Sequence, residues 1–467
     1  MKIHFHGADK EVTGSRHLLE VNGKKILLDC GMFQGRRQEE QEKNSNFGFD
    51  PRELHAVIIS HAHIDHTGAL PSLVKQGFNG PIYCTPATLD LLSYMLRDSA
   101  FIQEKEVEYL NEKKKLAGEE LAEPLYTIED AEKVFPLLKK LDYWQDLDVL
   151  GDGSVTARFR DAGHILGSAM VLFSIKDKDD GKDKTFVFSG DLGRSGMPLL
   201  HDPYQVETAD YLLLESTYGN RLHEPFDKAE EELAEVISRT AARGGKILIP
   251  AFSLGRTQEL IYSLHKLYNE EKIPEIPTYV DSPLSVNVTD VFRHHLVSLD
   301  EDTQKVFLNN KEDPFKFDQL RYVTSVEESK ALNNHNGPCI IISASGMCEH
   351  GRILHHIKNS IEDYRNTLII VGFQAQNTLG RKLVEKQNPV NVFGKPFNVK
   401  MEVKTMNTFS AHADRNDLLS YAKNISGLKK TILVHGEEQS INALKLGLME
   451  EGLKDVVVPS QGETIVL

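Results

Sequence analysis

The sequence of 467 residues predicts an α/β protein of two or three domains, and three observations support this prediction. The hydrophobic fraction is 40% and the charged fraction 26%, a balance typical of a globular chain rather than a disordered one. Short, wholly apolar runs end repeatedly in polar clusters, as buried strands of α/β sheets do. From about residue 220 these runs alternate with helical patterns, which indicates a parallel sheet.

The first half of the chain is predicted to be rich in strands. Asn22-Gly23, between HLLEV and KKILLD, predicts a β-hairpin. Further strands are predicted in AVIIS (56–60), VTARFRDAGH, AMVLFSI, TFVFSGDLG and YLLLESTYG. Residues 101–148 are rich in Lys and Glu, and they are predicted to form a helical stretch with a solvated face.

The second half is predicted to follow a helix, strand, helix order. A polar helix near 227–242 leads to the strand KILIP, and a second helix begins at Gly255. Later strands are predicted in TYVDSP, CIIISASGM and NTLIIVGF, and the strand-end pattern returns after about residue 400 in TMNTFSAHAD and TILVHGE. No period of 20–50 residues repeats, so a solenoid or propeller is not expected.

The formal net charge of −15 argues against a protein held on DNA or on a membrane by a general basic surface. It leaves room for a nucleic-acid enzyme with a local basic groove. No apolar run approaches the roughly 18 residues that span a bilayer, and the first residues lack a signal-peptide pattern. We therefore expect a cytoplasmic protein without membrane contact. The four cysteines have no CxxC spacing and are expected to be reduced thiols.

The segment HAHIDHTG places four ligand-type residues within six positions, directly after a buried strand. His61 and His63 are two apart on an extended segment, so they project to the same side and can bind one metal ion. Asp65 and His66 lie where the chain turns toward a helix and suit a second ion close by. Imidazole with carboxylate favours zinc, with manganese or iron as alternatives. A His-rich surface loop is the competing interpretation.

Other candidate ligands also follow apolar strands. His164 follows VTARFR, Asp191 follows TFVFSG, and His435 ends TILVH. The two oxygens of Asp191 could bridge two cations. Alone, His164 and His435 would more often be ordinary hydrogen-bonded histidines, but their repeated placement at strand ends favours metal binding. Asp29, which ends KKILLD, is expected to orient a ligand rather than to bind the metal itself.

These motifs together resemble the metallo-β-lactamase fold, because HxHxDH is followed by a later His, Asp and His. ESTYG, PAFSLGRTQE, FSAHAD and VHGE further resemble its β-CASP branch, and above all its RNA-cleaving members. Those are the endonuclease subunit of mRNA 3′-end processing and its bacterial and archaeal homologues. The resemblance covers nearly the whole chain. It implies an αββα metallo-β-lactamase sandwich in two parts, residues 1–208 and 397–467, with an inserted α/β β-CASP domain at 209–396 that lies over the site as a lid.

The resemblance also implies the roles of single residues. One zinc would be held by His61, His63 and His164. The other would be held by Asp65, His66 and His435, with Asp191 bridging. The implied catalytic residues are Asp65, Glu215 and His412. Substrate phosphate is expected to contact backbone amides and hydroxyls in turns after strands, at Ser216, Thr217, Ser345, Gly346, Ser410 and Ala411.

The implied activity is that of a zinc-dependent endoribonuclease acting on phosphodiester bonds of single-stranded RNA. Two Zn²⁺ ions sharing a hydroxide would supply the nucleophile, because metal coordination lowers the pKa of bound water to about 7. His412, supported by Glu215, would be the general acid. The assembly is left open, a homodimer included.

Three alternatives account for less of the sequence. A β-CASP DNA nuclease is disfavoured because those members typically have Val at the position of His435. A small-molecule metallohydrolase acting on thioesters or lactones would explain HxHxDH, but not Glu215, His412 or the large insertion. A non-enzymatic scaffold subunit is disfavoured because all seven candidate ligands are present.

Overall fold

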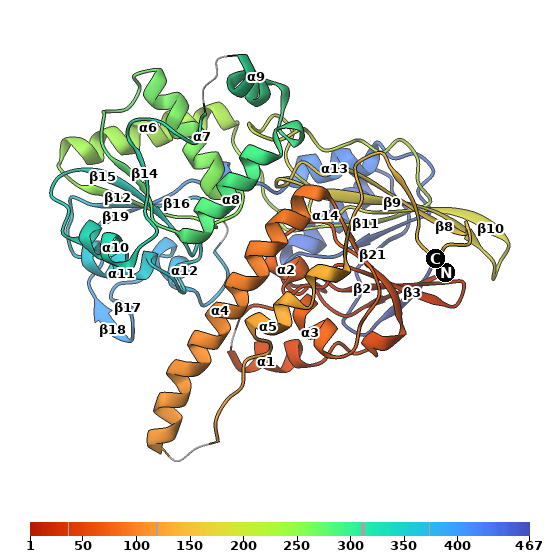
Figure 1. Ribbon diagram of the computed structural model, residues 1–467. Helices are drawn as coiled ribbons and strands as arrows, with labels where there is room; N and C mark the ends of the chain where they lie inside the picture. The colour runs from red at the N-terminus through yellow and green to blue at the C-terminus, as the bar shows by residue number, and fades with distance from the viewer. Residues whose placement is uncertain (36, 118–119, 310–312, 373) are drawn as a thin grey trace. The chain divides into compact units, whose positions relative to one another are not determined.

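A computed structural model describes residues 1–35, 37–117, 120–309, 313–372 and 374–467 of the protein (Figure 1). The chain divides into two compact units. Unit 1 comprises Met1–Ser195, His201–Leu222 and His412–Leu467, and unit 2 comprises Gly196–Leu200 and His223–Ala411. The chain therefore leaves unit 1 and returns to it, as a split domain with an insertion does.

The first sheet of unit 1 has the strand order β22-β1-β2-β3-β4-β5-β6. It is antiparallel from β22 to β3 and parallel from β3 to β6. Its strands are β1 (Lys2–Phe5), β2 (His17–Val21), β3 (Lys24–Leu28), β4 (Leu54–Ile58), β5 (Ile82–Cys84), β6 (Leu138–Lys140) and β22 (Thr464–Val466). The predicted hairpin joins β2 to β3, and Asn22 and Gly23 both have the positive φ that its tight turn requires.

The second sheet of unit 1 has the order β21-β20-β11-β10-β9-β8-β7. It is antiparallel from β7 to β10 and parallel from β10 to β21. Its strands are β7 (Asp146–Asp148), β8 (Val155–Asp161), β9 (Ala169–Asp177), β10 (Lys182–Phe188), β11 (Tyr211–Leu214), β20 (Lys430–Leu433) and β21 (Val456–Val457). β20 comes from the last part of the chain and pairs directly with β11, which closes the split domain.

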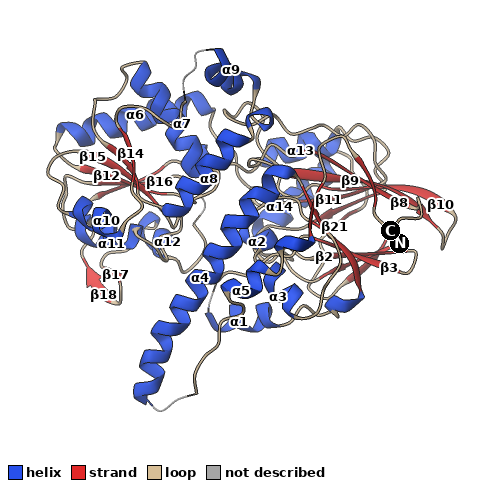
Figure 2. Cartoon of the chain, in the orientation of Figure 1, coloured by secondary structure: helices blue, strands red, loops and turns tan. Residues whose placement is uncertain are grey.

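The two sheets of unit 1 pack face to face and are covered by helices on their outer faces, as Figure 2 shows. Alternate strand residues of both sheets, such as Ile26, Ile58, Phe159 and Phe186, form one buried core. A second cluster packs α13 and α14 on the outer face of the second sheet. The helices of unit 1 are α1 (Arg37–Ser45), α2 (Ile64–Thr67), α3 (Leu70–Lys75), α4 (Pro86–Ala117), α5 (Ile128–Glu132), α13 (Arg415–Lys423) and α14 (Glu438–Glu450). This αββα sandwich confirms the fold class that the sequence predicts.

Unit 2 is built on a wholly parallel sheet with the order β14-β13-β15-β12-β16-β19. Its strands are β12 (Lys246–Pro250), β13 (Thr278–Val280), β14 (Leu320–Tyr322), β15 (Cys339–Ser343), β16 (Thr367–Ile370) and β19 (Glu402–Thr405), beside a hairpin of β17 (Val390–Val392) and β18 (Lys395–Phe397). Its helices are α6 (Phe226–Ala242), α7 (Arg256–Asn269), α8 (Pro283–His294), α9 (Glu301–Asn309), α10 (Val326–Asn333), α11 (Ile353–Ser360) and α12 (Leu379–Val384).

The structure differs from the sequence expectations at two places. The units change after Leu222 and Ala411, whereas the sequence expects domain boundaries after residues 208 and 396. The reason is strand pairing, because β11 lies in the second sheet of unit 1 and β19 pairs with β16 in unit 2. Residues 101–148 are also not all helical, since two short, charged edge strands, β6 and β7, follow α4 and α5.

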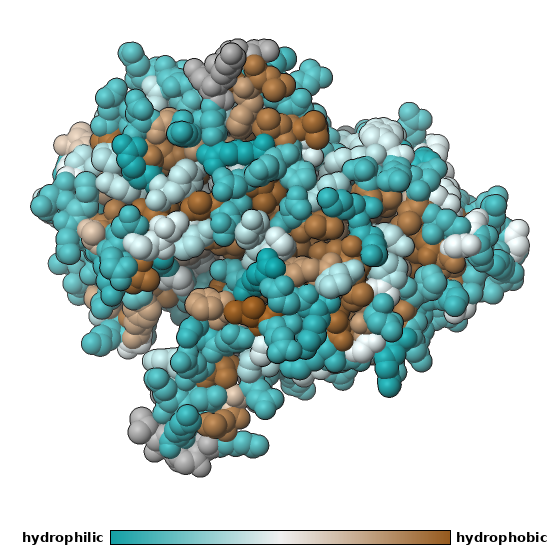
Figure 3. All heavy atoms as spheres, in the orientation of Figure 1, coloured by the Kyte–Doolittle hydropathy of each residue, from teal (hydrophilic) through white to brown (hydrophobic). Residues whose placement is uncertain are grey.

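The face of the molecule shown in Figure 3 is largely hydrophilic, with apolar side chains between the charged ones. Within the described ranges, none of the helices combines the length and the hydropathy needed to cross a bilayer. The four cysteines are buried and unpaired, and burial raises the pKa of Cys30 to about 12.

Candidate metal centre

Strand direction brings the candidate ligands to one edge of unit 1. β8 and β10 both run antiparallel to β9, and β10, β11 and β20 are mutually parallel. The carboxyl ends of these four strands therefore meet at one edge, where His164, Asp191, Glu215 and His435 follow them. The parallel strands β3 and β4 of the first sheet end in Asp29 and in the HxHxDH segment.

Close backbone packing fixes the loops that carry these side chains. The amide of Gly193 donates to the carbonyl of Ala162 at 2.8 Å. A Cβ at Gly193 would lie 1.9 Å from the carbonyl oxygen of Gly163, so only glycine fits there. This contact joins the loop of Asp191 to the loop of His164.

The seven predicted ligands fall into two groups in which one donor atom per residue lies within 4.8 Å of the others. The groups are His61, His63, His164 and Asp191, and Asp65, His66 and His435. Oδ2 of Asp191 lies 3.5 Å from Nε2 of His61 and 3.5 Å from Nε2 of His164. Oδ1 of Asp191 lies 3.3 Å from Nε2 of His66 and 3.4 Å from Nδ1 of His435. The two oxygens of one carboxylate thus face the two groups.

The spacing of the donor atoms suits tetrahedral metal sites. Nδ1 of His63 lies 3.1 Å from Nε2 of His61 and 3.3 Å from Nε2 of His164. Nε2 of His435 lies 3.3 Å from Nε2 of His66 and 3.6 Å from Oδ2 of Asp65, whereas the nitrogen of this ring that faces Asp191 is Nδ1. Ligands about 2.0–2.1 Å from a tetrahedral zinc ion are separated by about 3.3–3.4 Å. Oδ1 of Asp191 is also buried and has no hydrogen-bond donor among the described residues, which leaves it available to a cation.

The protonation states of His61, His63, His164 and Asp191 suit metal binding. Burial would lower the pKa of His66, but the charges of Asp191 and Asp29 raise it well above its usual range, so that ring must release a proton in order to bind an ion. Burial lowers the pKa of His61 and of His164 well below the usual range, and it lowers that of His63 to about 4. These imidazoles are therefore neutral, the form that binds metal. Burial would raise the pKa of Asp191, but the surrounding histidines hold it well below its usual range. Asp191 is accordingly a carboxylate.

Asp29 orients two of the histidines instead of joining the ligand groups. Its Oδ2 lies 2.6 Å from Nδ1 of His66, which directs Nε2 of that ring into the cluster. Asp29 also accepts from the amide of Ser60 at 2.7 Å and from the Ser60 hydroxyl at 2.8 Å. That hydroxyl lies 3.0 Å from Nδ1 of His61. The sequence did not single out Ser60, although its position directly before the first ligand is a usable signal.

Glu215 and His412 form a pair beside the cluster. Nδ1 of His412 lies 3.0 Å from Oε1 of Glu215, which also accepts from the amide of Leu192 at 2.8 Å. Burial would lower the pKa of His412, but the charges of Glu215 and Asp191 raise it to about 9. In the protein without bound ions, the imidazole is therefore protonated at neutral pH. Its side chain is 20% exposed while that of Glu215 is fully buried, so a substrate can reach only the histidine.

The residues expected to contact phosphate are less available than the sequence suggests. The amide of Ser216 donates to the carbonyl of His435 at 3.0 Å, and the amide of Thr217 donates to Glu215 at 3.1 Å. Ser345 donates its amide to the carbonyl of His350. The amides of Ser216, Thr217 and Ser345 are therefore already hydrogen-bonded, and phosphate contact at the six positions stays a prediction. Ser345, Gly346, Ser410 and Ala411 all belong to unit 2.

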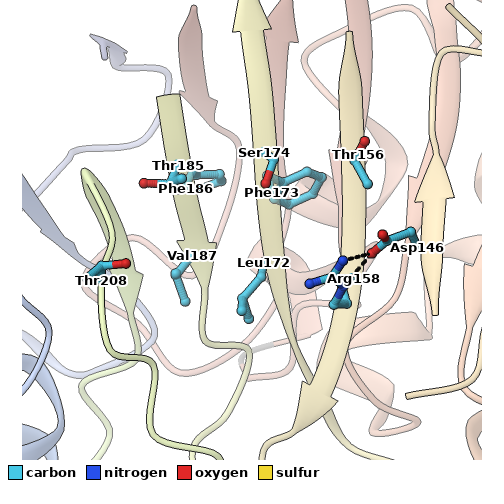
Figure 4. A pocket seen from close by; sticks show the side chains of 10 residues that line it. All are labelled: Asp146, Thr156, Arg158, Leu172, Phe173, Ser174, Thr185, Phe186, Val187 and Thr208. Carbon is cyan, nitrogen blue, oxygen red and sulfur yellow. Dashed lines mark hydrogen bonds and ion pairs between the residues drawn. The ribbon is translucent and has the colours of Figure 1, made fainter. Parts of the chain in front are cut away.

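A separate cavity of about 180 Å³ lies on the outer face of the second sheet (Figure 4). Thr156, Ser174 and Thr185 contribute hydroxyl groups to it, and Leu172 and Val187 contribute apolar surface. None of the predicted site residues lines this cavity. The candidate site is thus defined by the donor cluster at the sheet edge.

Family profiles match the chain in three consecutive segments. The metallo-beta-lactamase superfamily matches residues 12–251, the Beta-Casp domain residues 257–383, and the Zn-dependent metallo-hydrolase RNA specificity domain residues 397–459. A crystal structure of a protein of unknown function from Enterococcus faecalis V583 is similar in fold alone. It has a TM-score of 0.52 and 15% identity, and the match covers 100% of this chain and 99% of that one.

Several curated proteins are similar along nearly the whole chain. Ribonuclease TTHA0252 of Thermus thermophilus is 38% identical over 95% of both chains. An RNase J-like protein of Methanocaldococcus jannaschii is 32% identical, with 93% of this chain and 92% of that protein covered. Transcription termination factor FttA of Methanosarcina mazei is 33% identical over 93% of this chain, which spans only 66% of that factor's length. With the matched profiles, these similarities establish that the chain belongs to the metallo-β-lactamase superfamily and, within it, to the β-CASP metallo-hydrolases.

Proposed function

We propose that the protein is a zinc-dependent endoribonuclease with a two-ion active centre. The main support for this proposal is the carboxylate of Asp191, whose two oxygens face two separate groups of donor atoms at 3.3–3.5 Å. A ribonuclease relative at 38% identity and the matched RNA specificity domain support RNA as the substrate. The Glu215–His412 pair beside the donor groups supports a hydrolase rather than a structural metal site.

The residues present fit two divalent cations. His61, His63 and His164 would hold one ion, Asp65, His66 and His435 would hold the other, and Asp191 would serve both. When bound, such a pair of ions supplies an activated water as nucleophile and positive charge beside the scissile phosphate. Manganese or iron could take the place of zinc at these ligands.

The proton chemistry is assigned to His412. Glu215 holds Nδ1 of that ring, so Nε2 is the nitrogen that can pass a proton to the departing ribose oxygen. Glu215 is fixed in turn by the amides of Leu192 and Thr217. Glu215 thus favours the protonated form of His412 and fixes the orientation of its ring. Neither residue is assigned to the nucleophile.

The test compares substrates on the zinc-loaded full-length protein. Matched single-stranded RNA, single-stranded DNA and a thioester are incubated in parallel, and a covalently closed circular RNA is included because it has no ends. We expect cleavage of linear and circular RNA, and slower or no turnover of the other two. Cleavage of linear RNA alone would show an exonuclease and overturn the endonuclease assignment. Preferential cleavage of DNA or of the thioester would overturn RNA as the substrate.

A further inference from the structure

The single tryptophan of the chain, Trp144, lies on the surface of unit 1 between β6 and β7. Its side chain is 63% exposed. Its backbone has φ of 70°, a conformation that bulky residues rarely adopt, and its amide donates to the carbonyl of Phe159 at 3.2 Å. Core packing does not explain a large aromatic ring held in this way at the surface.

Two side chains pack against this ring. The guanidinium carbon of Arg160 lies 3.5 Å from the centroid of the Trp144 ring and 5.3 Å from that of Tyr204. The ring of Tyr204 meets Trp144 edge to face, with centroids 5.3 Å apart and planes at 88°. Arg160 is only 5% exposed, so the rings cover the guanidinium while much of Trp144 faces solvent. We call Trp144, Arg160 and Tyr204 the aromatic platform.

The positive charge of Arg160 is not neutralised by a carboxylate in the described part of the chain. Arg158, two positions earlier on the same face of β8, forms an ion pair with Asp146 (Figure 4). Arg160 makes no ion pair with any carboxylate in the described part of the chain. Its Nη1 donates to the carbonyl of Phe159 at 2.8 Å, and its buried Nε has no hydrogen-bond partner there. The guanidinium of Arg160 beneath the Trp144 ring favours binding of an electron-rich planar group that carries negative charge.

The platform is close to the metal centre along the chain. Arg160 is four residues before the candidate ligand His164, a span of at most about 14 Å. The carbonyl of the intervening Asp161 accepts from the amide of Tyr204 at 2.9 Å. A Cβ on Gly163 would lie 2.8 Å from Pro203, so the segment with Tyr204 packs against the loop of His164. A polymer cut at the metal centre would reach the platform within a few nucleotides.

We propose that the aromatic platform stacks one unpaired base of a single-stranded RNA substrate, a few nucleotides from the bond that is cut. This inference rests on the proposed ribonuclease function and extends it by a base-binding site. An indole face accepts any of the four bases, so the platform would add affinity without sequence preference. An RNA duplex, whose bases are already stacked, would not use it.

The first experiment uses the emission of Trp144, which reports on the platform alone because the chain has no other tryptophan. The zinc-loaded full-length protein is titrated with a phosphorothioate single-stranded RNA, and the affinity is measured independently by the anisotropy of a labelled strand. We expect the emission to be quenched with the same midpoint. Trp144→Leu should bind about 5- to 150-fold more weakly, the range measured for loss of one stacked base. Trp144→Phe, which keeps a smaller ring, should fall between the two.

A matched control is Tyr364→Ala, which removes an aromatic ring that is 73% exposed in unit 2 and should leave the affinity unchanged. The second experiment scans an abasic site along the RNA. At one position of the RNA, removal of the base should lower the affinity of the wild type as much as the substitution Trp144→Leu does. The same abasic RNA should bind Trp144→Leu no more weakly than the intact RNA does.

The outcomes separate the two proposals. If RNA binds and is cut, but the emission is unchanged and Trp144→Leu binds as tightly as the wild type, the platform is not an RNA site and the ribonuclease proposal stands. If the zinc-loaded wild type neither binds nor cuts any RNA, the ribonuclease proposal fails and the platform inference fails with it.

Discussion

A single carboxylate, that of Asp191, links the two donor groups. Its oxygens lie 3.3–3.5 Å from nitrogens of both groups, and it is almost fully buried. Asp191→Ala should therefore reduce the metal content from two ions per chain to one or none, because both ions lose a ligand. Elemental analysis after zinc loading measures this. Asp183→Ala, at an exposed position of β10, the strand that precedes Asp191, is the control and should keep two ions. A wild type with no bound metal would contradict the centre as assigned.

A second residue-level prediction separates metal binding from proton transfer. His412 is assigned to the proton and not to an ion, so His412→Ala should keep both ions and still bind RNA. Its single-turnover cleavage should be slower by about 10²–10⁴-fold, the usual contribution of a general acid. An RNA with a better leaving group needs less protonation, so it should show a smaller defect.

Glu215 gives the control for this assignment. Since Glu215 holds and charges the same imidazole, Glu215→Gln should slow cleavage in the same direction, and the double variant should be scarcely slower than the worse single one. Loss of an ion from His412→Ala would show that the histidine is a metal ligand. A donor atom of His412 does lie within 4.8 Å of donor atoms of Asp191 and Glu215. Full activity would place the acid elsewhere.

The sequence locates the metal-type side chains well because they directly follow apolar strands, and strand ends converge in space. It locates their hydrogen-bond partners poorly. Ser60 is marked only by its position before the first ligand, and Thr217 is expected to contact phosphate. In the structure, Ser60 lies between Asp29 and His61, and Oγ1 of Thr217 lies 3.2 Å from Nδ1 of His435. A hydroxyl becomes informative only when the fold shows which side chain it faces.

At the scale of elements, buried strands are predictable and short edge strands are not. β4, β10, β12 and β15 each contain an apolar run that the sequence marks clearly. β6 and β7 are three residues each, LKK and DLD, and their charges suit the edge of a sheet. Composition alone therefore assigns them to the preceding helical stretch.

The helix α4 carries a half-buried acid, Asp98, that gives a pH prediction. Burial raises the pKa of Asp98 to about 6. Between about pH 4 and pH 6 the folded state keeps a proton that the unfolded state has released, so this group makes the protein less stable as the pH rises through that window. Relative to Asp98→Asn, the wild type should lose about 1–3 kcal/mol of unfolding free energy between pH 4 and pH 7.5.

Urea unfolding of both proteins across this range measures the effect. Glu112→Gln, at an exposed position of the same helix, should follow the wild type. An identical pH dependence of the wild type and Asp98→Asn would show that Asp98 titrates normally.

At the scale of the whole molecule, the exact ends of the inserted unit decide whether unit 1 can fold without it. Unit 1 resumes at His412, and its sheet places β11 between β10 and β20. Removing residues 223–411 and joining the ends with a short linker should leave a folded unit that binds two zinc ions. Removing residues 209–396, the boundaries expected from the sequence, should not, because β11 is then lost from the middle of the sheet.

Circular dichroism, thermal unfolding and elemental analysis of the two deletions test this prediction. A folded, metal-binding protein from the second deletion would mean that β11 is dispensable. Failure of both would mean that unit 1 needs the inserted unit in order to fold. The sequence identifies the insertion from the gap between candidate ligands, but its ends depend on strand pairing, which leaves no local mark in the sequence.

The distance along the chain between His66 and His435, whose Nε2 atoms lie 3.3 Å apart, has a consequence for synthesis on the ribosome. The first donor group is complete once Asp191 has emerged, whereas the second group and the proton donor need the last part of the chain. At about 5–20 residues per second, translation takes about 12–50 s to pass from Asp191 to His435. Under the proposed assignment, a nascent or prematurely terminated chain would therefore acquire at most one ion and would lack the acid. Cleavage of RNA would then begin only when the chain is nearly finished, so an unfinished chain would not cut the messenger that encodes it.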